Sequence, residues 1–76
     1  MKRVEVAWRD STRYDLGWGP VKDYAKLATP YLCYTTGYLA HQNARYVLVA
    51  LSSGPDDTVN QAIAIPRGCI VKVRRL

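Results

Sequence analysis

The sequence predicts a small, mainly β domain of five short strands, and three observations support this fold class. The first is length, because 76 residues suffice for one domain, 1–76, and a domain this small buries only about 60% of its unfolded surface. The second is that apolar residues come in short runs rich in β-branched and aromatic side chains. The third is that glycine and proline residues, which form turns, separate these runs.

The first strand is expected at residues 4–8, where Val4, Val6 and Trp8 alternate with smaller or charged residues. Period-two alternation is typical of a half-buried strand, so Trp8 is predicted to lie in the core. A long excursion follows, and it contains a helical pattern over 20–27 with Pro20 at the expected first helical position. We therefore predict one or two helical turns that end before Pro30.

Four further strands complete the prediction. Residues 31–41 and 45–52 should form a hairpin, with Gly37 marking a bulge or a sharp bend. The other two strands are expected at 61–65 and 69–75, joined by a tight connection at 66–68.

This order of elements is that of an SH3-like barrel, which has a first strand, a long loop, three meandering strands, a tight turn and a last strand. In such a barrel the long first loop folds over the barrel, and closure removes the exposed strand edges. The alternative prediction is an α+β fold in which an antiparallel sheet carries one short helix.

The last eleven residues, "PRGCIVKVRRL", suit either a basic tail or a final strand. Alternation favours a barrel-closing strand with two distinct faces. The predicted apolar face carries Cys69, Val71 and Val73, and the predicted opposite face carries Ile70, Lys72 and Arg74.

Composition restricts the function classes. Eleven basic residues against six acidic residues give a net charge of +5, which favours acidic partners such as nucleic acid or an acidic protein surface.

The two cysteines, Cys33 and Cys69, fit free thiols, and with one histidine they are too few for a closed zinc site, so no metal or cofactor is expected. Glu5, Arg9 and Asp10 interrupt the place where a signal peptide would be apolar, and no apolar run is long enough for a membrane span. We therefore expect a cytoplasmic protein that does not bind membranes.

Three blocks, "VEVAWRDS", "TTGYL" and "IPRGCIVKVRRL", resemble a group of small hypothetical proteins of tailed bacteriophages. The resemblance covers under half of the chain and includes no catalytic signature. It implies a phage or prophage origin, a location in the cytoplasm of a bacterial host and a small accessory role.

No enzyme activity is expected from the sequence. His41 lies at a predicted strand end and is expected to be an exposed turn residue rather than a general base. The Asp56–Asp57 pair after Gly54 and Pro55 is typical of a turn, although two carboxylates could also bind a cation.

The aromatic residues are the strongest functional signal, because the chain has six Tyr and two Trp but no Phe. Tyr, Trp and Arg are enriched at binding hot spots. Trp18 and Tyr24 could alternatively fold inward as the lid of a small core. The predicted partner-binding residues are those of the long loop and of one strand face, namely Tyr14, Trp18, Tyr24, Arg13, Tyr34 and Tyr38.

The preferred hypothesis is a non-enzymatic interaction module that binds a protein, either a host factor or a second copy of itself as a homodimer. The alternative is a nucleic-acid-binding barrel, since aromatic rings stack on bases while cations contact phosphates. A third interpretation is a minor component of the virion. The residues assigned to nucleic acid under the alternative are Arg67, Lys72, Arg74 and Arg75.

Overall fold

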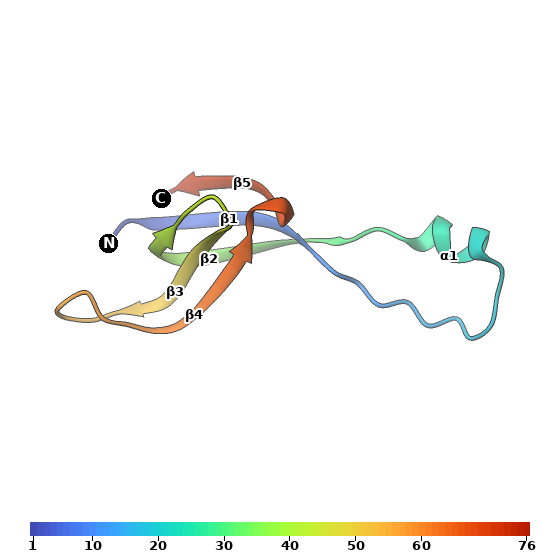
Figure 1. The fold of residues 1–76 in the computed structure, drawn as a ribbon, viewed down its shortest axis with the longest axis horizontal. Helices are drawn as coiled ribbons and strands as arrows, with labels where there is room; N and C mark the ends of the chain where they lie inside the picture. Colours follow the sequence, from blue (N-terminus) through green and yellow to red (C-terminus); the bar gives the residue numbers. More distant parts are fainter.

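The computed structural model describes residues 1–76 and confirms a mainly β fold with one short helix (Figure 1). The helix has seven residues and is too short to cross a membrane. The elements in chain order are β1 (Arg3–Asp10), α1 (Val21–Leu27), β2 (Tyr31–Gln42), β3 (Tyr46–Ser53), β4 (Val59–Pro66), the 3-10 helix η1 (Arg67–Cys69) and β5 (Ile70–Arg75).

The five strands form a single antiparallel sheet in the order β4-β3-β2-β1-β5. Strands β1 to β4 follow one another as a meander, and β5 returns to pair with β1, as the predicted element order requires. The predicted barrel is not closed, because β4 and β5 lie at opposite edges of the sheet with no ladder between them. Pro66 ends β4, and the three residues of η1 carry the chain across to the far side of β1. The basic side chains of β5 oppose pairing of that free edge with another strand.

The core is small and lies between β1 on one side and β3 and β4 on the other. Its largest fully buried side chains are Val6, Val47, Val49 and Ile65. Trp8, predicted to lie in the core, is found half-buried at its margin, with its indole Nε1 donating a hydrogen bond of 2.9 Å to Thr35 Oγ1. This bond satisfies the polar atom of the indole while the ring covers apolar surface.

Strand β2 belongs to both halves of the sheet and bends where it passes from one to the other. Its first half pairs with β1, its second half pairs with β3, and the register shifts between Leu39 and His41. Gly37 lies at the crossing, where a Cβ atom would clash with the carbonyl oxygen of Ala50 and lie 2.8 Å from Val49 Cγ1. The predicted irregularity of β2 is therefore found between Leu39 and His41 rather than at Gly37, and Gly37 is required because the two backbones approach too closely for a side chain.

The predicted faces of β5 are confirmed for Lys72, Val73 and Arg74 but are wrong for Ile70 and Val71, because the strand contains a bulge opposite β1. Trp8 pairs with Ile70 and Ala7 pairs with Lys72, so Val71 is an extra residue without a partner. The extra residue exchanges the faces before and after it. As a result Ile70 packs against the core, whereas Val71 is 56% exposed on the outer face beside Lys72 and Arg74.

The β3–β4 loop contains the predicted tight turn. Asp56 and Asp57 have φ angles of 55° and 56°, and the Thr58 amide donates a hydrogen bond of 3.2 Å to the Pro55 carbonyl oxygen. Two successive residues with positive φ define a type I′ turn, in which glycine is strongly preferred at the second central position.

Replacing Asp57 by glycine should therefore raise the free energy of unfolding by about 0.5–1 kcal/mol. This net effect is the steric strain that glycine removes at a positive φ, reduced by the larger conformational entropy that glycine loses on folding. Urea denaturation followed by circular dichroism measures the change. Asp57→Ala is the matched control, since it removes the same charge but keeps a Cβ, and it should give no gain. Equal stabilisation by both variants would show that charge, not backbone conformation, is responsible.

Candidate binding surfaces

Residues 11–30 form an arm that projects from the sheet along the long axis of the molecule (Figure 1). The molecule measures 54 × 20 × 20 Å, and α1 lies near the far end of the arm. The prediction that the long first loop folds over the barrel is therefore wrong. The pairing of β1 with β2 ends at Asp10 and Tyr31, and beyond that pair the chain leaves the sheet.

Two tyrosine hydroxyls hold the arm together. Tyr24 Oη donates to the Gly17 carbonyl oxygen at 2.6 Å and accepts from the Leu16 amide at 2.9 Å. Tyr14 Oη donates to the Thr29 carbonyl oxygen at 3.1 Å, across the base of the arm. The sequence predicts that both tyrosines contact a partner, but each is half-exposed and uses its polar atom inside the arm.

The tip of the arm exposes apolar side chains instead of burying them. Trp18 is 106% exposed, Val21 is 84% exposed and Leu16 is 53% exposed. The alternative in which Trp18 and Tyr24 cover an undersized core is therefore wrong, because neither residue reaches the sheet. The cations of the arm are also exposed, with Lys22 and Lys26 on α1 and Arg13 beside Tyr14 nearer the base.

A second surface lies on the outer face of the half-sheet formed by β2, β1 and β5. Ala7 on β1 pairs with Tyr34 on one side and with Lys72 on the other. Directly paired residues point to the same face, so the three side chains form one row with the smallest in the middle. This row crosses a groove of about 270 Å³, which is lined by Glu5, Ala7, Leu32, Tyr34, Val71, Lys72 and Arg74 and is called the Ala7 groove below.

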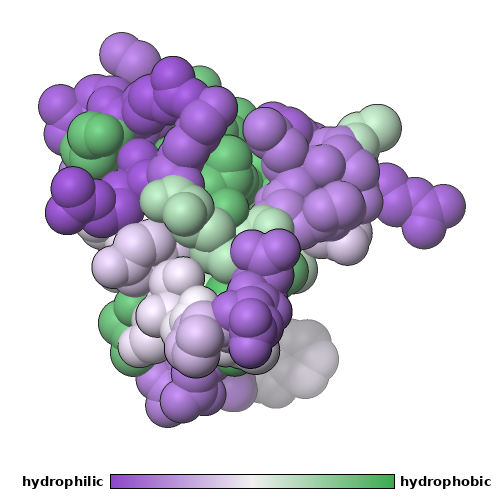
Figure 2. All heavy atoms as spheres, turned by 90° about the vertical axis from the view of Figure 1, so that its left-hand side faces the viewer, coloured by the Kyte–Doolittle hydropathy of each residue, from purple (hydrophilic) through white to green (hydrophobic).

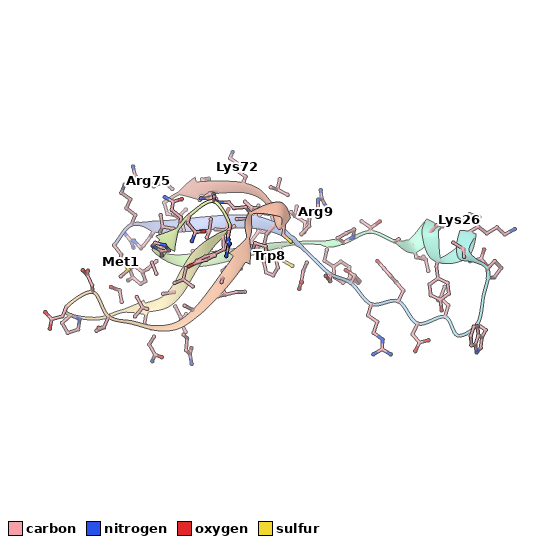
Figure 3. All side chains as sticks on the ribbon, in the orientation of Figure 1. Met1, Trp8, Arg9, Lys26, Lys72 and Arg75 are labelled. Atoms are coloured by element: carbon pink, nitrogen blue, oxygen red, sulfur yellow. The ribbon has the colours of Figure 1, made fainter.

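The Ala7 groove is open, and its lining is mostly apolar, with two cations, Lys72 and Arg74, against one carboxylate, Glu5. Tyr34 is 63% exposed, and Arg74 makes an ion pair of 3.2 Å with Glu5 while remaining 57% exposed. Arg9 lies next along β1, opposite Leu32. Lys72 and Arg9 point to the upper side of the sheet in Figure 3, opposite to Trp8.

The other predicted site residues lie outside the Ala7 groove. Tyr38 is half-buried where β2 bends, opposite Arg3 and Ala50. Arg67 uses its guanidinium to hold the β2–β3 turn, with Nε donating to the Asn43 carbonyl oxygen at 2.9 Å. Arg75 pairs with Val4, whose side chain is buried in the core, so Arg75 belongs to the face opposite Lys72 and Arg74. Of the four basic residues assigned to nucleic acid, the structure brings together Lys72 and Arg74.

A larger groove of about 480 Å³ lies between β2, β3 and β4, and no charged residue lines it. One of its lining residues, Gln61, has a φ of 54° in the middle of β4. Apolar surface shows between hydrophilic side chains at the end of the molecule opposite the arm (Figure 2).

The histidine and the two cysteines are dispersed. His41 stacks at a tilt against Tyr46, with ring centroids 6.0 Å apart. Cys33 pairs with Trp8, and Cys69 ends η1, so the two free thiols lie on either side of Trp8. This arrangement does not place a nucleophile beside a general base.

Sequence reasoning missed the Ala7 groove as a unit. The alternation in residues 4–8 places Ala7 on the solvent face, but only the pairing of three strands sets it between Tyr34 and Lys72.

No known protein family matches the chain, and no curated protein or solved structure is significantly similar to it.

Proposed function

We propose that the protein is a small non-enzymatic accessory protein of phage type, an interaction module that binds a host protein through the tip of its arm. The observation that carries the proposal is the complete exposure of Trp18 at the end of a hydrogen-bonded projection. Burial of an exposed indole by a partner is favourable, and Trp is among the residues most enriched at binding hot spots, with Tyr and Arg.

The arm is organised in a way that favours binding. The bonds of Tyr24 to Gly17 and Leu16, and of Tyr14 to Thr29, restrict the loop before any partner arrives. A loop that is already ordered loses less conformational entropy on binding. In this proposal Trp18, Leu16 and Val21 provide the apolar contact, and Arg13, Lys22 and Lys26 favour a partner surface with acidic residues.

The test is photo-crosslinking in bacterial cells with a benzophenone amino acid at position 18 or, as a control, at position 34. We expect position 18 to crosslink to one host protein and position 34 not to crosslink to it. Affinity of the purified pair should fall at least about 30-fold in Trp18→Ala, the size of a hot-spot loss.

Because Trp18 packs on nothing in the sheet, Trp18→Ala should leave circular dichroism and the urea midpoint unchanged. Tyr34→Ala is the matched control, an exposed aromatic on the sheet, and should bind the host protein as the wild type does. If Trp18→Ala retains full affinity, the arm tip is not the contact. If the crosslinked species is a second copy of the chain, the partner is the protein itself and not a host factor.

A further inference from the structure

We propose that the Ala7 groove is a second binding site and that it accepts single-stranded nucleic acid, with one base on the Tyr34 ring and the backbone along Arg9, Lys72 and Arg74. This site is separate from the arm tip and does not depend on the function proposed for it. It rests on the shape of the row, on the chemistry of its ends and on its charge.

The row has the shape of a slot. Tyr34 and Lys72 are on strands β2 and β5, which flank β1, so their Cα atoms are two strand spacings apart, about 10 Å. Ala7 forms the floor between them and offers only a methyl group. A stacked base occupies about 3.4 Å in thickness, so it fits above Ala7 against the ring without displacing either wall.

The ends of the slot have the chemistry that a nucleotide needs. The ring of Tyr34 is exposed, and its hydroxyl makes no hydrogen bond within the protein, unlike those of Tyr14 and Tyr24. An exposed ring on a strand face is a stacking platform that accepts any base. Leu32 and Val71 extend the apolar floor on either side of the slot.

The charge on this face favours a polyanion. Lys72 and Arg74 line the groove and Arg9 continues it, against a single carboxylate, Glu5, which is paired with Arg74. Cations arranged along one face beside a stacking ring match the alternation of phosphate and base in a single strand. In a duplex the bases are stacked on one another and their faces are not available to Tyr34.

The experiment is fluorescence anisotropy of the full-length protein with a labelled oligothymidylate of about 15 nucleotides, at 50 mM and 200 mM salt. Contacts to three phosphates predict a slope of log affinity against log salt of about −2. Tyr34→Ala should weaken binding roughly 5- to 150-fold, and Tyr34→Phe, which keeps the ring, should bind as the wild type does.

One matched pair and one single variant test the charges. Lys72→Ala should weaken binding and reduce the salt slope by about 0.7, whereas Arg75→Ala, which removes one charge from the other face of the same strand, should leave the slope unchanged. Glu5→Gln should strengthen binding a few-fold because it removes the groove's carboxylate and releases Arg74. Trp18→Ala should have no effect, which separates this site from the arm.

Four outcomes would overturn the proposal: no binding at 50 mM salt, equal binding of duplex, equal losses in Lys72→Ala and Arg75→Ala, or full competition by polyglutamate at the same charge concentration. The last would identify the groove as a site for acidic peptides. Each variant changes an exposed or half-exposed side chain, so unchanged circular dichroism is expected and confirms that the fold is intact.

Discussion

Gly37→Ala should lower the free energy of unfolding by about 3 kcal/mol, at the upper end of the cost of overpacking. The added Cβ would clash with the Ala50 carbonyl oxygen, which is backbone and cannot move without displacing β3. A domain of this size has a total stability of only about 4–11 kcal/mol, so the variant should lose a large part of it. Urea denaturation monitored by circular dichroism measures the loss.

Gly68→Ala is the matched control for Gly37→Ala. Nothing lies within 4 Å of the position that a Cβ would take at Gly68. Its effect should therefore stay within about 0.5 kcal/mol of zero. A Gly37→Ala variant as stable as Gly68→Ala would contradict the close crossing of β2 over β3.

Ile65→Ala should lower the free energy of unfolding by about 3 kcal/mol, because Ile65 is completely buried among Val47, Val49 and the valines of β1. Removing its side chain leaves a cavity in a core of few large side chains, and an open sheet offers little material to fill it. The loss should appear as a lower urea midpoint with an unchanged denaturant slope.

Ile63→Ala removes the same atoms two residues earlier on the same strand and provides the control for Ile65→Ala. Ile63 is 40% exposed, so folding removes only part of its side chain from water and gains only part of the free energy of burying it. We expect a cost of about 1 kcal/mol from the smaller area that it removes from water. Similar losses of stability in both variants would contradict the burial of Ile65, and not Ile63, in the core.

The sequence predicted the strands well, because alternation and turn residues act over a few neighbouring positions. All five strands, the short helix and the tight turn before β5 lie where these local patterns place them. The glycine inside the tyrosine-rich strand β2 predicted a bulge or a bend, which is found two residues later, between Leu39 and His41, whereas the close approach of two backbones at Gly37 was not predicted.

The errors concern quantities that depend on distant parts of the chain. Barrel closure depends on whether β4 reaches β5, and the faces of β5 depend on one unpaired residue, Val71. Trp18 could not be assigned from the sequence either, because the same indole suits a buried lid and an exposed tip. The Ala7 groove likewise depends on the pairing of residues that are far apart in the chain, Ala7, Tyr34 and Lys72.

The projecting arm also determines how the protein moves through solution. A compact chain of 76 residues should have a radius of gyration of about 11 Å, whereas this molecule has 16.1 Å. The monomer should therefore experience more friction than a sphere of its mass and leave a sizing column early, at the position of a larger globular protein. An early elution volume is thus the expected signature of a single copy, and light scattering gives the mass that distinguishes it from a dimer.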